Sequence, residues 1–439
     1  MKTKILFVLT LATVFLLILN FSVFAGGPKE AEKEEIKLTV WINGSDSYIG
    51  PEEQKLPQDQ WYISQAFRRF EKLHPGVKIE LYVPPDQEGA HQAFKAAVLG
   101  GTGPDVANLW TGQAIFNLKD VILPIDDLIP PEDLKNIWGW ESLRLDFKPD
   151  GPILGYPASQ NQLCFLLYNK KIARMAGLDL DKNPPRTPEE FNEVLSKIKA
   201  LGIDPIVVDE SFPWFFAWIG DYWWAQVSGS DGILAATHGK RKFSDDEGLL
   251  NALRYYRSLY ENGFFNQDMG TSADSWNRFL QGQGGMTPVV TSFLSDAERA
   301  LGEDAGVLMP PDISPNAMIT NSTIGGPGQS LVVSKSTKYP KLAVALISFL
   351  NSKEEVIRAQ KVQQVPPVRT DLTIDELGYE PGSNIAFLYK NYAKNYIYWP
   401  DNLLTPGVAE VFYRMTPLVA LGKMTPEELA AEMDAAVGR

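Results

Sequence analysis

From Ile36 onward, short apolar segments alternate with segments of helical periodicity, and this alternation limits the chain to few architectures. The segments "IKLTVWI", "VKIELYV" and "DVANLW" are predicted strands. Helices are predicted between them, over residues 59–73 and through "HQAFKAAVLGG". Such alternation is typical of α/β folds with mostly parallel sheets.

A second run of the same kind follows. "LCFLLYN" and "PIVV" read as buried strands, and a helix is predicted over 188–202, with Thr187 as its N-cap and Glu190 at capping-box spacing. Ser244 is the predicted cap of a long helix, and Thr425 the cap of the last one. A chain of 439 residues exceeds what one core usually organises, so two lobes are expected.

The first 25 residues have the features of a secretory signal peptide. Lys2 and Lys4 precede an uncharged run, and Val23 and Ala25 have the spacing of a cleavage site after Ala25. Because the apolar run is long, an uncleaved membrane anchor is the alternative. Residues 26–35 are predicted to form a solvated linker.

Charge and cysteine content exclude several classes of protein. Removal of the leader would change the net charge from −13 to −15, which argues against nucleic acid and anionic membrane surfaces as partners. Cys164 is the only cysteine, so no internal disulfide can form. Stability must therefore come from the size of the core.

Catalytic and metal-binding motifs are not found in the sequence. His74, His91 and His238 lie far apart without metal-ligand spacing, and no Gly-x-Ser-x-Gly motif occurs. Acidic pairs that could hydrolyse a glycoside are not marked by any pattern. No metal, no cofactor and no catalysis are expected.

Polar and aromatic residues follow several predicted strands, where open α/β sheets bind their ligands. Trp110 ends one strand, Asn43 and Asp46 follow another, and Asn161 and Gln162 precede a third. Each has an ordinary alternative. Trp110 could belong to the core, Asn43-Gly44 is a turn dipeptide, and the two amides could satisfy only a crossover backbone.

The stretch "SFPWFFAWIGDYWW", residues 211–224, contains eight aromatic residues, of which four are tryptophans. Burial of rings in the core is one explanation, and a flat surface for a ligand is the other. Apolar residues surround every side of the helix expected here, so periodicity does not decide between them.

Taken together, these segments resemble the extracellular solute-binding proteins of bacterial ABC importers, in particular the carbohydrate-binding group. The similarity rests on "KLTVWINGSDS", "AAVLGGTGPDVANLW", "LGYPASQNQLCFLLYNKKIARMAGL", "RTPEEFNEVLSKIKALG", "FLQGQGGMT", "GVLMPP" and "GGPGQSLVVSKSTKYPKLAVALISFLNSKE", in this order along the chain. The insertion "SYIGPEEQKLPQDQ" has no clear counterpart and is a candidate rim element.

The resemblance implies the type II periplasmic-binding-protein fold, which has two α/β lobes with the ligand cleft between them. One lobe would comprise 34–160 and 313–364, and the other 161–312 and 365–439. Hinges would lie near "SQNQ", "MPPDI" and "QVPPV".

The resemblance also implies ligand-binding positions and a function. The ligand-binding positions would be Asn43, Asp46, Trp110, Thr111, Asn161, Gln162, Trp214, Trp218, Phe293, Trp399 and Asp401. Trp214 and Trp218 would stack on a sugar, whereas Phe216, Trp223 and Trp224 would pack inside the lobe. A monomer is expected to capture a mono- or oligosaccharide outside the cytoplasm and to deliver it to the permease subunits. A sugar phosphate is the alternative ligand, and a secreted carbohydrate-active enzyme is the alternative of another class.

Overall fold

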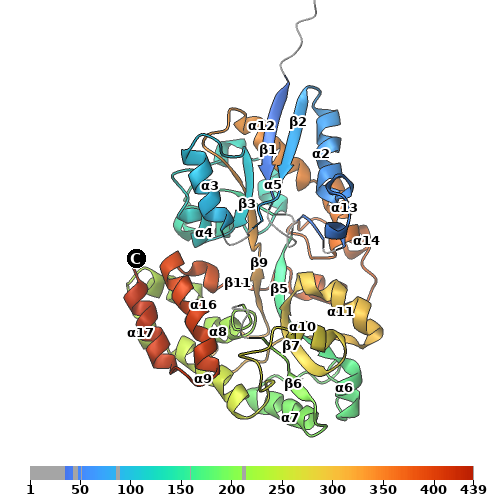
Figure 1. Cartoon of the computed structure of the whole chain (residues 1–439), viewed down its shortest axis with the longest axis vertical. Coiled ribbons are helices and arrows are strands. Elements are labelled where there is room, and N and C mark those ends of the chain that lie inside the picture. Colours follow the sequence, from blue (N-terminus) through green and yellow to red (C-terminus); the bar gives the residue numbers. More distant parts are fainter. Residues whose placement is uncertain are drawn as a thin grey trace, which may run out of the picture.

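The chain folds into two α/β lobes, one above the other in Figure 1. This computed structural model describes residues 35–42, 48–50, 52–85, 89–158, 160–209 and 214–438. The leader, most of the linker, and Asn43 and Asp46 therefore lie outside the described residues. None of the helices in the described ranges has both the length and the apolar character needed to cross a bilayer.

The first lobe is built on a five-stranded sheet of order β2-β1-β3-β10-β4. Its strands are β1 (Ile36–Trp41), β2 (Val77–Tyr82), β3 (Val106–Trp110), β4 (Tyr156–Pro157) and β10 (Gln329–Val333). β1 pairs in parallel with β2 and β3, whereas β10 runs antiparallel to β3 and β4. Its helices are α2 (Tyr62–Leu73), α3 (Ala90–Leu99), α4 (Gln113–Phe116), α5 (Pro131–Asn136), α12 (Pro340–Leu350) and α13 (Lys353–Gln363).

The second lobe is built on a sheet of order β11-β9-β5-β7-β6, to which β8 adds by pairing with β5. Its strands are β5 (Gln162–Asn169), β6 (Asp204–Ile206), β7 (Gly284–Val290), β8 (Ala305–Leu308), β9 (Ile324–Gly326) and β11 (Ile397–Tyr398). Its helices are α6 (Lys170–Met175), α7 (Pro188–Lys199), α8 (Gly220–Thr237), α9 (Glu247–Glu261), α10 (Ser275–Leu280), α11 (Leu294–Leu301), α14 (Ile374–Leu377), α15 (Asn384–Tyr392), α16 (Pro406–Ala420) and α17 (Pro426–Ala436).

The expectation of mostly parallel sheets is wrong in detail, because both sheets are mixed. β5 runs antiparallel to β7, β8 and β9, while β6 and β7 are parallel. When strands and helices alternate along the chain, neighbouring strands pair in parallel as long as the chain stays within one lobe. A chain that leaves a lobe and returns can enter its sheet from the opposite direction.

The central strand β5 explains why "LCFLLYN" is apolar throughout. Cys164, Leu166 and Tyr168 belong to one hydrophobic core, and Leu163 and Phe165 belong to another. Successive side chains of a strand point to opposite faces, so β5 is covered on both sides. The first lobe has its own core around its sheet.

Two of the three predicted N-cap residues are confirmed. Thr187 accepts a hydrogen bond from the backbone of Glu190, and Thr425 forms a full capping box at the start of α17. The cap of α9 differs from the prediction, since Asp246 accepts from the backbone N–H of Gly248 and Leu249. Ser244 instead donates its hydroxyl to Asp434.

The chain crosses between the two sheets at positions that correct the expected lobe boundaries. β9 belongs to the second sheet and β10 to the first, so the middle crossing lies at 326–329 and not at 313. The segment "MPPDI" is held within the second lobe, where Trp223 donates its indole N–H to Pro311 O at 3.0 Å. The two prolines of this segment favour the prediction of a hinge, but proline can also end a strand.

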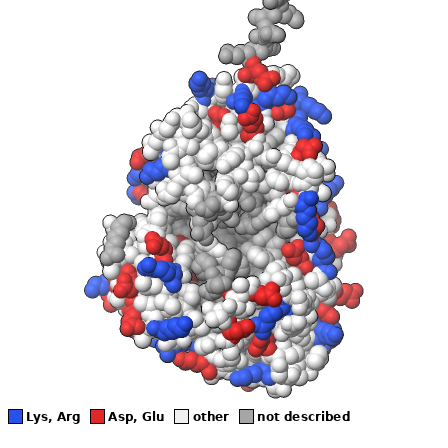
Figure 2. All heavy atoms as spheres, viewed as in Figure 1, with Lys and Arg blue, Asp and Glu red and all other residues white. Residues whose placement is uncertain are grey.

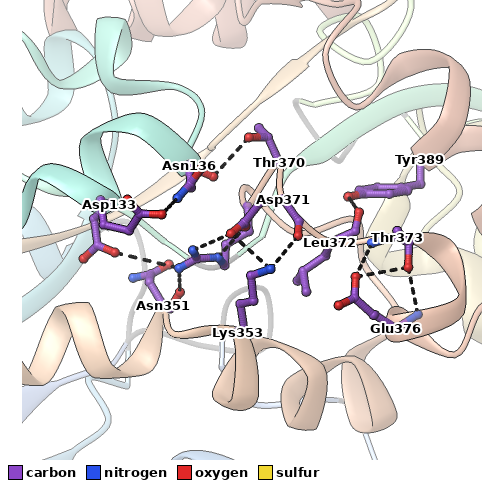
Figure 3. Close-up of polar contacts among 12 residues, drawn as sticks. Asp133, Asn136, Asn351, Lys353, Thr370, Asp371, Leu372, Thr373, Glu376 and Tyr389 are labelled. Atoms are coloured by element: carbon purple, nitrogen blue, oxygen red, sulfur yellow. Dashed lines mark hydrogen bonds and ion pairs between the residues drawn. The ribbon is translucent and has the colours of Figure 1, made fainter.

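The last crossing also begins later than residue 365. Backbone bridges join Pro367 to Gln160 and Arg369 to Ile137, and Trp138 donates its backbone N–H to Val368 O. Figure 3 shows this segment held by polar groups of the first lobe, and Tyr389 of α15 donates to Leu372 O at 2.8 Å. The chain thus leaves the first lobe at about 370–372.

Candidate functional site

A cavity of about 650 Å³ lies between the lobes. In the first lobe it is lined by His91, Gln92, Lys95, Trp110, Ala114, Asn117 and Leu118. In the second lobe it is lined by Trp214, Asp401, Asn402, Leu404, Pro406, Ala409, Glu410, Tyr413, Arg414 and Pro417. Its volume falls in the range of small-molecule sites. The face in Figure 2 is hollowed between the lobes, and charged side chains lie mostly on the outer parts of that face.

Three aromatic rings from both lobes form a wall of this cavity. The rings of Trp110 and Trp214 meet edge to face, with centroids 5.8 Å apart and an angle of 85° between their planes. Trp214 meets Tyr413 in the same manner at 4.8 Å. Edge-to-face geometry is favourable for aromatic pairs. Because Trp110 ends β3 and Tyr413 lies on α16, this wall is complete only while the two lobes are in contact.

His91 helps to fix Trp110 at the end of β3. The backbone N–H of Trp110 donates to His91 Nε2 at 3.0 Å, and the two ring centroids are 5.0 Å apart. His91 Nε2 must therefore be unprotonated in this arrangement. His91 is the second residue of α3 and is 8% exposed, so it both lines the cavity and supports Trp110.

Asp401 is an acidic residue that lines the cavity and contacts Tyr413 of the aromatic wall. It opens a short 3-10 helix (Asp401–Leu403) and is buried. Tyr413 donates its hydroxyl to Asp401 Oδ2 at 2.6 Å. Burial raises the pKa of the Asp401 carboxyl, whereas the hydrogen bond from Tyr413 lowers it.

Hydrogen bonds join the lobes directly beside the cavity. The Thr111 hydroxyl is 2.7 Å from the hydroxyl of Tyr398 and donates to Pro327 O at 2.7 Å. Gly112 has φ of 68°, and a Cβ there would lie 2.5 Å from Asn402 O. Glycine therefore permits the close approach of the two lobes at this point.

The structure brings together three of the predicted ligand-binding residues, Trp110, Trp214 and Asp401, at one cavity. Thr111, the next residue after Trp110, is fully buried and is not among the residues that line the cavity. Trp399 is also buried and donates its indole N–H to Gly326 O at 3.3 Å. A ligand role for these residues stays a prediction.

Trp218 does not share the surroundings of Trp214. The expected single helix is absent here, because residues 214–219 form turns and α8 begins at Gly220. Trp218 contacts Phe293 edge to face at 5.5 Å, and Phe293 contacts Trp276 at 5.0 Å. The two predicted stacking tryptophans therefore face different ring clusters.

The predicted amides lie at the first crossing. Asn161 is fully buried and donates its side-chain amide to Ala393 O at 2.6 Å. Gln162 accepts a hydrogen bond from the backbone N–H of Ser292 at 3.2 Å, next to Phe293. Both amides thus join the first crossing to segments of the second lobe, and Gln162 lies on the side of the Trp218 and Phe293 cluster.

Several cavity residues were missed from the sequence, among them His91, Lys95, Glu410, Tyr413 and Arg414. They lie on α3 and α16, whose patterns are those of ordinary amphipathic helices. Among the described residues, no group of three or more His, Cys, Asp or Glu side chains is placed to hold a metal ion.

A second cavity, of about 720 Å³, lies between residues 146–148 and the C-terminal half of α8 with the residues that follow it. Asp146, Lys148, Asp231 and Lys240 are among its lining residues, and Phe147 is its aromatic residue. It lacks the wall of several rings that the first cavity has. The 650 Å³ cavity is therefore the stronger candidate for a ligand site.

Comparisons with known proteins agree with this architecture. Residues 65–377 match the family of bacterial extracellular solute-binding proteins. A chitin oligosaccharide binding protein superposes with a TM-score of 0.76 at 18% identity, over 92% of this chain and 98% of that one.

Two further solved structures are similar over nearly their whole length. A solute-binding protein of an ABC transporter from Thermotoga lettingae, bound with α-D-tagatose, has a TM-score of 0.69 at 22% identity, covering 92% of this chain and all of that one. The GacH receptor of Streptomyces glaucescens, solved unliganded and with acarbose, has a TM-score of 0.68 at 19% identity, covering 91% and 97%. The shared two-lobed fold and the match over residues 65–377 show that this chain belongs to the bacterial extracellular solute-binding proteins.

Proposed function

We propose that this protein captures a mono- or oligosaccharide between its lobes outside the cytoplasm and delivers it to the permease subunits of an ABC importer. The observation that carries this proposal is the wall of Trp110, Trp214 and Tyr413, with the Asp401 carboxyl beside it. Rings suit the C–H faces of a sugar, and carboxylate and amide groups suit its hydroxyls.

The charges around the cavity support a neutral ligand. Lys95 and Arg414 are balanced by Asp401 and Glu410. Asn117 also lines the cavity, and an amide side chain can donate and accept several hydrogen bonds with hydroxyls, although Asn117 already donates one to Gln113 O. The similar structures point the same way, since their names or ligands refer to chitin oligosaccharide, tagatose and acarbose.

A sugar phosphate is the second candidate ligand, and Lys95 and Arg414 are the observation that favours it. The sequence offered no arginine in the predicted cleft loops, but the structure places Arg414 at the cavity from α16. A thermal-shift panel should therefore contain neutral sugars and their phosphate esters.

A neutral saccharide is expected to raise the melting temperature more than its phosphate ester does. Ligand at 100 times its dissociation constant stabilises by about 2.7 kcal/mol, which is readily measured. Stabilisation by phosphate esters alone would favour the second candidate. Release of the chromophore from chromogenic glycosides would instead indicate an enzyme. We expect no release.

Binding is also expected to compact the protein in solution. The contacts between Trp110 and Trp214, and between Thr111 and Tyr398, exist only when the lobes meet, so a ligand that touches both lobes should favour this state. Small-angle scattering with and without the stabilising sugar measures the radius of gyration. An unchanged radius at saturation would contradict closure. The same data report the molecular mass, for which we expect a monomer.

A further inference from the structure

Asp221 is a second buried acid, next to Asp401, that the proposed function does not use. It lies in the first turn of α8 and is fully buried. The start of α8 packs against the short 3-10 helix that Asp401 opens, and the two buried carboxyls interact electrostatically. No described donor reaches either Asp221 oxygen, or Asp401 Oδ1, with ordinary hydrogen-bond geometry.

Two buried carboxylates close to each other repel strongly, so one of them must keep its proton. Asp401 is the better carboxylate because the Tyr413 hydroxyl donates to it at 2.6 Å. Asp221 has no such side-chain donor, and a proton on Asp221 can bond to Asp401 Oδ1. This single proton would join one Asp221 oxygen to Asp401 Oδ1, which otherwise has no described donor.

We propose that Asp221 and Asp401 share one proton, with Asp221 as the acid and Asp401 as the carboxylate, and that this pair holds the Tyr413 ring in the cavity wall. Asp221 is then a positioning residue, which acts through Asp401 and Tyr413 on the ring of Trp214. The shared proton does not depend on the proposed carbohydrate ligand. Only its consequence for ligand binding rests on the proposed function.

Several titratable side chains surround the pair. Cys164 on β5 is fully buried, and burial together with Asp401 and Asp221 raises the pKa of its thiol. Tyr398 on β11 and Tyr413 on α16 also have raised pKa values, first because of burial. Lys95, Glu410 and Arg414, with the neutral His91, line the cavity beside Asp401.

The direction of the pKa shift gives a pH dependence. Burial and then the charge of Asp401 raise the pKa of Asp221 well above its usual range. The native state therefore keeps a proton that the unfolded chain releases above about pH 4. Stability from this group is fully present below that pH and is lost as the pH rises toward the native pKa.

Asp221→Asn tests this in the unliganded protein, because the asparagine amide can donate to Asp401 without titrating. Between about pH 5 and pH 7, the unfolding constant of the wild type is expected to rise about tenfold per pH unit relative to that of Asp221→Asn. Urea melts at each pH measure both constants. A constant ratio across this range would overturn the shared proton.

Infrared spectroscopy of the wild type keeps the proposal testable even if Asp221→Asn fails to fold. A protonated-carboxyl C=O band is expected in the native protein at neutral pH and should vanish on unfolding. Absence of the band in the native protein would overturn the proposal. Neither measurement needs a ligand, so a failed sugar screen leaves both outcomes unaffected.

Discussion

Replacement of Arg369 by alanine is expected to lower the free energy of unfolding by about 3–5 kcal/mol. Arg369 is 5% exposed and forms ion pairs with Asp371 at 2.8 Å and Asp133 at 3.8 Å. It also donates to Asn351 O at 2.8 Å. Its partners Asp133, Asn351 and Asp371 are labelled in Figure 3. Its removal would leave the buried Asp133 carboxyl with two donors among the described residues, the hydroxyls of Tyr156 and Ser348.

The same substitution at an exposed ion pair provides the control. Arg254 pairs with Glu427 at 2.5 Å, but both side chains are about half exposed. Arg254→Ala should therefore change stability by less than about 1 kcal/mol. Urea unfolding followed by tryptophan fluorescence compares the two variants. Equal, small losses would show that Arg369 is not an anchor of the last crossing. If Arg369→Ala does not fold, Arg369→Lys keeps the charge and should show an intermediate loss.

The sequence predicted the elements of this fold better than their connections. Helix starts at Thr187 and Thr425 were correct because caps are local. The predicted crossing near "MPPDI" lies too early in the chain, because the observed crossing is at 326–329. Proline occurs both at hinges and at the ends of strands, so it does not distinguish the two. Only the pairing of β9 with β5 and β11, which joins residues far apart in the chain, distinguishes the two.

The candidate site could be predicted in part, where its residues follow strands. Trp110 ends β3, so the rule for open α/β sheets identifies it. Tyr413 and Arg414 lie within α16, where nothing local separates a cavity residue from a surface residue. The surroundings of Trp214 and Trp218 were not predictable either, since they depend on where the turns of 214–219 end and α8 begins.

Replacement of Trp214 by alanine is expected to weaken binding of the stabilising sugar by about 1–3 kcal/mol, which is roughly 5- to 150-fold in the dissociation constant. Trp214 lies at the centre of the aromatic wall, in contact with Trp110 of the first lobe and Tyr413 of the second. Its loss removes a stacking surface and also a contact that exists only when the lobes meet. Isothermal titration calorimetry with the sugar found in the thermal-shift panel measures the effect.

Three further variants separate stacking from unrelated losses. Trp214→Phe keeps a flat ring and should retain much of the affinity, whereas Trp138→Ala removes an indole that is 40% exposed and does not line the cavity, so affinity should not change. Trp218→Ala tests the other ring cluster. A loss at Trp218 with wild-type affinity at a folded Trp214→Ala would move the sugar to the side of Phe293 and Trp276, whose rings are 5.0 Å apart. Losses at both positions would indicate a ligand long enough to reach both clusters, because turns 214–219 present the two tryptophans to different neighbours.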